Sequence, residues 1–177
     1  MKKLHYILLG IIFASMFACS EADKEMFKGP DSICFRFPQT SDDIDEYRKL
    51  DSSLIFREDT VVYSFAFDME ATERVICIPV QIGGMATGHE RTYMIEVEEY
   101  NGTQAGVHYE ALRKEQVLGA EKTTDSLRVK FFRRDMDKVA RKIGLRIKTG
   151  GDFVEGAQER LFLAIQVSDI LEKPSWW

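Results

Sequence analysis

The sequence has few of the residues on which several classes of protein depend. It contains three cysteines in 177 residues, which excludes a disulfide-dense mini-protein. Its 24 lysines and arginines are outnumbered by 29 acidic residues, and the formal net charge is −5. The chain therefore lacks the basic surplus of a nucleic-acid-binding protein. Since 45% of its residues are hydrophobic, it is a globular chain of about one domain and not a disordered one.

The first eighteen residues have the pattern of a secretory signal peptide. Lys2 and Lys3 give a positively charged start, and residues 4–17 are mostly apolar. This apolar stretch is shorter than the roughly 20 residues of a membrane span. The segment Met16-Phe17-Ala18-Cys19 resembles the bacterial lipobox, whose cysteine is acylated, for example with palmitate, and becomes the new N-terminus. A plain signal peptide with an incidental cysteine is the alternative.

Residues 19–31 are predicted to be a lipidated cysteine and a flexible tether. The acidic, polar residues 20–25 resemble the signal that Bacteroidota use to export lipoproteins to the outer face of the outer membrane. A merely solvated tether is the alternative. Without residues 1–18 the chain has 159 residues and a formal charge of −7, because the leader carries two lysines and no acidic residue. We expect an outer-membrane lipoprotein that faces the cell exterior and is held by the acyl chains on Cys19.

Residues 32–177 read as one all-β domain. Alternation of apolar and polar residues with period two is typical of half-buried strands, and it occurs in seven segments: 33–37, 61–67, 74–82, 93–97, 127–131, 145–148 and 161–167. A short strand is possible at 116–118, and short helices at 135–143 and 41–50. The sequence therefore predicts a two-sheet antiparallel sandwich of immunoglobulin type, with seven or eight strands and one or two short helices.

One motif leads to a family resemblance. Residues Thr103 to Tyr109 (TQAGVHY) resemble the T-x-x-G-x-D-Y element of Calx-beta domains. Together with the lipobox, Gly83-Gly84 and the closing Lys173-Pro174-Ser175-Trp176, it makes the chain resemble small, uncharacterised Bacteroidota surface lipoproteins with an Ig-like, Calx-beta-related domain. This resemblance implies a fold and a location, but no reaction.

The family resemblance also implies a role. Such lipoproteins are often encoded beside starch-utilisation-type importers, in which a TonB-dependent barrel carries a lipoprotein lid. The expected function is therefore an accessory binding module that captures glycan or peptide at the surface, with the barrel and its lid as partners. A structural or adhesive scaffold without a small ligand is the alternative, and a carboxylate-based hydrolase is a third possibility.

The resemblance to Calx-beta domains suggests a calcium site, because the calcium sites of those domains gather several carboxylates at strand ends. Here the acid position of the motif is His108, a poor ligand for a hard cation. Glu110, Asp152 and Asp169 are the nearest alternatives in the order of elements. A structural corner formed by Gly106 and Tyr109 explains the motif better, so we expect no metal and no cofactor.

Catalytic motifs are missing from the sequence. After residue 18, histidine occurs only at His89 and His108, and neither belongs to an H-E-x-x-H motif. There is no G-x-S-x-G nucleophile elbow, and no P-loop or dinucleotide fingerprint. We therefore predict that the protein is not an enzyme.

Exposed aromatic rings are candidates for ligand contact, because sugar C–H faces stack on them. The candidates are Tyr47, Tyr100 and Trp177, and packing in the core or at its rim is the alternative for each. Cys34 and Cys77 both fall in predicted strands. We expect them to be buried free thiols, with a disulfide as the alternative.

Three Asp-Ser/Thr-apolar triplets resemble the O-glycosylation site of exported Bacteroidota proteins. They place the modified hydroxyls at Ser32, Thr60 and Ser126. Each triplet precedes or opens a predicted strand, so ordinary turn chemistry is the alternative.

Overall fold

The computed structural model describes residues 30–38, 44, 47, 51–136 and 139–170. Within these residues the chain forms ten strands and two 3-10 turns: β1 (Ser32–Phe35), β2 (Ile55–Arg57), β3 (Thr60–Ser64), η1 (Phe65–Phe67), β4 (Glu73–Gly83), β5 (Arg91–Tyr100), β6 (Glu115–Leu118), β7 (Thr124–Phe132), β8 (Arg141–Gly151), β9 (Val154–Glu155), η2 (Gln158–Arg160) and β10 (Phe162–Ser168). No helix in this described part has the length and hydropathy of a membrane span. The all-β class predicted from the sequence is confirmed.

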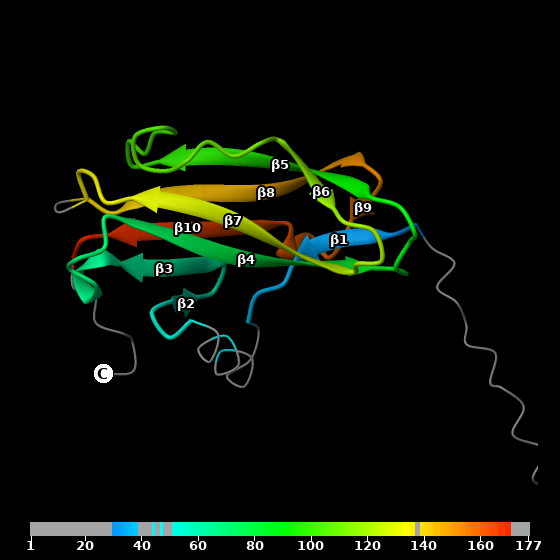
Figure 1. The fold of residues 1–177 in the computed structure, drawn as a ribbon, viewed down its shortest axis with the longest axis horizontal. Helices are drawn as coiled ribbons and strands as arrows, with labels where there is room; N and C mark the ends of the chain where they lie inside the picture. The colour runs from blue at the N-terminus through cyan, green and yellow to red at the C-terminus, as the bar shows by residue number, and fades with distance from the viewer. Residues whose placement is uncertain (1–29, 39–43, 45–46, 48–50, 137–138, 171–177) are drawn as a thin grey trace, which may run out of the picture.

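The strands form two sheets that pack face to face (Figure 1). One sheet has the order β7-β4-β1-β9, and the other has the order β2-β3-β10-β8-β5-β6. Most neighbours are antiparallel, but β1 with β9 and β3 with β10 are parallel. The sandwich is therefore mixed and not purely antiparallel as predicted, because strands far apart in the chain can pair in parallel across long connections.

Inward-facing side chains of both sheets form the core. Two strands supply long runs of core residues, in which every second side chain is at most 4% exposed. These are Ile76, Ile78, Val80 and Ile82 from β4, and Ile143, Leu145 and Ile147 from β8. Each such side chain contributes about 1.5–3 kcal/mol when fully buried. Tyr93 on β5 crosses the core and donates its hydroxyl to Asp125 on β7, at 2.7 Å. This bond joins the two sheets.

An ion pair fixes the point where the chain enters the sandwich. The guanidinium of Arg91, the first residue of β5, is almost fully buried; it pairs with Asp31 and donates to the carbonyl of Lys122 at 3.0 Å. It also lies over the ring of Phe153, 4.9 Å from the centroid. A Cβ at Gly84 would lie 2.1 Å from the Asp31 carboxylate, so this close approach requires glycine. We call the Asp31–Arg91 pair the entry clasp.

The strands predicted from period two are all present, and the short strand expected at 116–118 is β6. Two strands escaped prediction, β2 and β9, because three and two residues are too few to show a period. The strand expected over 61–67 is too long. It ends at Ser64, whose side chain accepts from the N–H of Ala66 at 3.2 Å and so starts the turn η1.

The helix predicted for 135–143 is wrong. Asp135 has a left-handed φ of 50°, which interrupts a helix, and the chain enters β8 at Arg141. Met136 and Ile143 are both buried, but Ile143 belongs to the period-two pattern of β8. The spacing of these two buried residues suggested one helix face, but Met136 precedes β8 and Ile143 belongs to it. The helix predicted for 41–50 lies largely outside the described residues.

Candidate functional site

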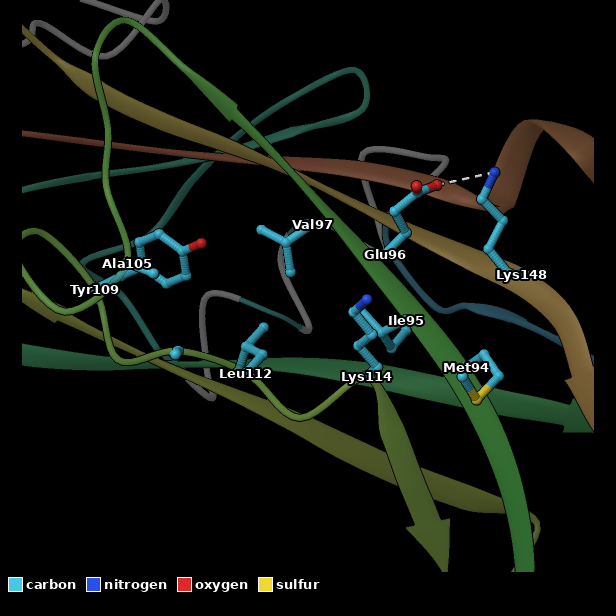
Figure 2. A pocket seen from close by; sticks show the side chains of 10 residues that line it. Met94, Ile95, Glu96, Val97, Ala105, Tyr109, Leu112, Lys114 and Lys148 are labelled. Carbon is cyan, nitrogen blue, oxygen red and sulfur yellow. Dashed lines mark ion pairs between the residues drawn. The ribbon is translucent and has the colours of Figure 1, made fainter.

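A solvent-open groove of about 490 Å³ runs along β5, beyond the end of β6. Its lining residues come from β5, from the connection between β5 and β6, and from β8: Met94, Ile95, Glu96, Val97, Ala105, Tyr109, Ala111, Leu112, Lys114 and Lys148. Figure 2 shows Tyr109 and Leu112 on one side of β5, with Glu96 and Lys148 on the other. The volume is in the range of small-ligand sites, about 300–1,000 Å³. We call this the β5 groove.

The groove exists because β6 is shorter than β5. β6 pairs only with Arg91 to Met94, and the last contact on that side is the N–H of Ile95 donating to the carbonyl of Lys114 at 2.7 Å. Backbone groups alternate in direction along a strand, so the N–H and C=O of Val97 point the same way as the N–H of Ile95. The described chain places no strand beside Val97 on that side. An unpaired stretch of strand edge therefore faces the groove.

The wall opposite this edge is the corner formed by the Thr103–Tyr109 motif. The Glu99 carboxylate of β5 accepts from the backbone N–H of Ala105 and from the hydroxyl of Tyr109, each at 2.8 Å. Tyr109 is 3% exposed, and burial together with the nearby Glu99 raises the pKa of its hydroxyl. The hydroxyl therefore stays neutral and donates. Gly106 turns the chain with a φ of +77°.

Two buried polar residues hold the base of this corner. Thr103 accepts from the N–H of Lys142 at 2.9 Å and donates to the carbonyl of Tyr100 at 2.6 Å. His108 is 4% exposed, and its Nδ1 accepts from the N–H of Gln104 at 3.0 Å. Burial, and secondarily the charge of Arg141, lower the pKa of His108. The imidazole is therefore neutral, and the expectation that this motif is a structural corner is confirmed.

The rim of the groove carries one cation without a counter-ion in the described part of the chain. Lys148 pairs with Glu96 at 2.9 Å, across β8 and β5 (Figure 2). Lys114 is exposed, and no described carboxylate lies within ion-pair distance of it. The floor beneath it is apolar, with Val97 and Leu112 packed against the core. This arrangement suits a ligand with an apolar body and a negative charge.

Neither Tyr47 nor Tyr100 lines the β5 groove. Tyr47 lines two smaller hollows at β4, of about 270 and 260 Å³; its hydroxyl donates to the carbonyl of Arg36 at 2.5 Å, and its ring packs edge-on against Phe56. Tyr100 is 38% exposed at the end of β5, and its hydroxyl donates to Glu98. Trp177 lies outside the described residues.

The three glycosylation candidates lie at or near strand starts. Ser32 and Thr60 are the first residues of β1 and β3, and both are half-buried. Thr60 donates to its neighbour Asp59 at 3.0 Å, as turn chemistry predicts. Ser126 is the third residue of β7 and is exposed. Together with Tyr47 it lines the two smaller hollows. Cys19, the predicted lipidation site, lies outside the described residues.

The residues considered for calcium are not assembled into a site. Asp152 follows β8 and Asp169 follows β10, and these strands are antiparallel, so the two carboxylates lie at opposite ends of the sheet. Asp169 accepts two hydrogen bonds from Arg133, at 2.8 and 2.7 Å, and Asp152 accepts from the backbone N–H of Thr92 at 2.7 Å. Within the described ranges, no three His, Cys, Asp or Glu side chains form a group that could hold a metal ion.

The two thiols are free, and their positions explain why. Both point outward from the four-stranded sheet, and Cys34 lies opposite Gln81, four residues along β4 from Cys77. Four residues of strand span about 13 Å, which exceeds the roughly 7 Å that a disulfide allows. The expectation that both are buried is wrong, since Cys77 is exposed and Cys34 is half-buried. Burial raises the pKa of the Cys34 thiol.

The sequence did not identify the residues of the β5 groove. From the sequence alone, Val97 and Leu112 are ordinary apolar residues, and Lys114 is an ordinary solvent-exposed lysine. The short strand expected near 116–118 was not a sufficient signal, because its pairing with β5 and the full length of β5, Arg91–Tyr100, are known only from the structure. A short strand cannot cover the whole edge of a long one, and the uncovered part is where the groove lies.

Three solved structures are similar to part of this chain. The CBD1 domain of Calx in its apo form shares 8% identity, with a TM-score of 0.46 over 65% of this chain and 94% of that one. The calcium-binding domain CBD12 of CALX1.1 shares 11% identity, with a TM-score of 0.47 over 66% and 45%. A protein from Bacteroides ovatus, provisionally described as carbohydrate-binding, shares 15% identity, with a TM-score of 0.41 over 69% and 37%. This chain thus spans less than half the length of the last two.

No curated protein matches the sequence. Residues 27–177 match the family described as "Domain of unknown function (DUF4843)". That match takes in the whole sandwich, from the entry clasp to β10, and it leaves out only the predicted leader and part of the predicted tether. The chain belongs to the DUF4843 family.

Proposed function

We propose that this protein is a binding module without catalytic activity, which captures a glycan or peptide ligand in the β5 groove. The observation that carries the proposal is the combination of three features at one place: a strand edge at Val97 and a Lys114 ammonium that both lack a partner among the described residues, and an apolar floor. A few polar groups around an apolar hollow are typical of ligand sites. The titratable groups of the lining are Glu96, Tyr109, Lys114 and Lys148, which suit recognition better than bond cleavage.

The location and the partners are part of the same proposal. The lipobox resemblance supports an anchor on Cys19, and the acidic residues after it support export to the outer face of the outer membrane. At that face, the module would act beside a TonB-dependent importer and its lipoprotein lid. The alternative is a structural or adhesive scaffold that binds no small ligand.

The decisive experiment tests whether ligand enters the groove. Full-length protein, extracted in detergent, is applied to glycan and peptide arrays. A ligand found there is measured again with Ala105→Trp, which fills the groove from an exposed position. Ala86→Trp is the matched control, because Ala86 is also exposed and lies on the connection between β4 and β5. We expect the first variant to weaken binding at least tenfold and the second to leave it unchanged.

Two results would contradict ligand capture. If Ala105→Trp binds the ligand as well as the parent protein does, the site lies elsewhere. If no glycan or peptide binds, but the protein co-purifies with an importer barrel, the scaffold function replaces the binding function.

A further inference from the structure

We infer that the ligand of the β5 groove is an extended peptide, which binds by adding a strand to β5 at Val97 and places an acidic side chain against Lys114. This inference rests on the proposed function, because it concerns the same groove. It goes further by naming the class of ligand and the way in which it is recognised.

The strand edge supplies the first argument. The N–H and C=O of Val97 face the groove without a strand partner in the described chain. The connection from Ala105 to Lys114 is held away from this edge, since its two ends are fixed by Glu99 and by the N–H of Ile95. An extended peptide offers a matching row of N–H and C=O groups, and main-chain hydrogen bonds give affinity in this mode of recognition. A glycan offers no such row.

The lining supplies the second argument, because it favours a peptide over a sugar. Sugar rings stack on exposed aromatic faces. Among the described residues, the one aromatic ring that lines this groove is Tyr109, which is 3% exposed. The floor consists of aliphatic and small side chains, among them Val97 and Leu112. Side chains of an added strand alternate in direction, so every second one would lie on this apolar floor.

Charge supplies the third argument. Lys148 is already paired with Glu96, and the Glu99 carboxylate already accepts two hydrogen bonds. Lys114 has no carboxylate partner in the described chain, and its backbone carbonyl marks the last hydrogen bond before the open edge. A carboxylate on the peptide would therefore meet a free ammonium group where the added strand passes β6.

A lysine beside a free strand edge has a second known use, which is to keep other chains away. The two roles make opposite predictions. If Lys114 guards the edge, its replacement promotes self-association of β5 edges between two copies. If Lys114 recognises an acidic peptide, its replacement weakens peptide binding and leaves the protein monomeric.

The experiment uses full-length protein in detergent and synthetic peptides of alternating valine and threonine. One peptide carries a central glutamate and its matched control a central lysine. We expect the glutamate peptide to bind and the lysine peptide to bind roughly tenfold more weakly, since attraction is replaced by repulsion. Lys114→Glu should reverse this preference. Static light scattering on the same samples reports self-association.

Strand addition has its own signature in the peptide backbone. N-methylation removes one amide donor at a time, and only every second amide of an added strand faces β5. A methyl scan along the glutamate peptide should therefore alternate between losses above tenfold and no effect. On the protein, Val97→Pro removes the N–H that faces the groove, whereas Val97→Ala keeps it. We expect a larger loss of binding for proline, with both variants checked for a native circular dichroism spectrum.

The outcomes separate this inference from the proposed function. If groove-filling Ala105→Trp abolishes binding but the methyl scan shows no alternation, the groove binds its ligand without strand addition, and the inference is overturned while the proposed function stands. A glycan that binds in the groove would have the same consequence. If Ala105→Trp changes nothing, both fail. Self-association of Lys114→Ala, which leaves the edge without this charge, with no loss of binding to the glutamate peptide, assigns Lys114 to guarding the edge and overturns its role in recognition.

Discussion

His108 makes the stability of the corner depend on pH. In the folded protein, burial and the charge of Arg141 lower the pKa of this imidazole, while in the unfolded chain it titrates near its ordinary value of about 6.5. Between these two values the unfolded chain binds more protons than the folded protein. The free energy of unfolding therefore falls as the pH falls below about 6.5. Protonation would also turn Nδ1 from an acceptor into a donor that faces the N–H of Gln104.

A conservative variant isolates this contribution. The amide oxygen of His108→Asn can accept from the same N–H but does not titrate. We expect the variant to lie within about 1 kcal/mol of the parent protein at pH 7, and to lose less stability between pH 7 and pH 5. Urea denaturation at both pH values measures this difference. Carboxylates that titrate in the same range affect both proteins equally, so identical pH profiles would show that His108 plays no part.

At the scale of elements, the connection between β5 and β6 depends on one carboxylate. Glu99 accepts from Ala105 and from Tyr109, so Glu99→Ala removes both hydrogen bonds at once. Because Glu99 is exposed, we expect a modest loss of stability, about 1 kcal/mol. We expect a larger local effect, with faster hydrogen exchange of the amides between residues 104 and 112 and no change in β4 and β7.

The control for this prediction lies in the same connection. Glu110 is exposed, and its side chain accepts no hydrogen bond from described residues, so Glu110→Ala should leave hydrogen exchange unchanged. If both variants accelerate exchange to the same degree, the loss of a negative charge is responsible and not the loss of the two hydrogen bonds.

The elements also show how much the sequence could predict. Alternation of apolar and polar residues located seven strands, because one face of each strand is buried and the other is solvated; β6 was expected only as a possible short strand. It could not locate β9, which has two residues, and it took Met136 and Ile143 for one helix face. The β5 groove could not be predicted from the sequence for a different reason. It arises from a difference in length between two paired strands, and no residue in it has an unusual identity.

At the scale of the whole molecule, the entry clasp joins the N-terminal end of the sandwich to β5. Arg91 is almost fully buried, and Asp31 is three-quarters buried. Removing one partner of such a pair leaves an uncompensated charge. We expect Arg91→Met to lower the free energy of unfolding by about 3 kcal/mol, measured by urea denaturation. Arg113→Met, which removes an exposed arginine, should change it by less than about 0.5 kcal/mol.

The predicted anchor is also a property of the whole molecule. Cys19→Ala removes the acyl acceptor, so we expect the variant to leave the membrane fraction and to lose surface labelling, since no other lipid attachment is predicted. Cell fractionation and protease accessibility on intact cells measure this. The matched control is Cys34→Ala, which removes a half-buried thiol on the outer face of the four-stranded sheet and should stay anchored. A Cys19→Ala protein that remained in the membrane fraction, still labelled from outside, would refute the anchor.

The entry clasp has a mechanical consequence if the protein is tethered at Cys19. Pulling on the tether would load the hydrogen bonds between β1 and β4 in shear, where four register pairs, Ser32 with Gly83 to Phe35 with Val80, share the force. The clasp adds a second route for the force, from Asp31 through Arg91 directly into β5. Val97 lies six residues further along that strand, about 20 Å away. A force applied to a captured ligand would then be transmitted to the anchor along β5 and the clasp, without separating the strands of the sandwich.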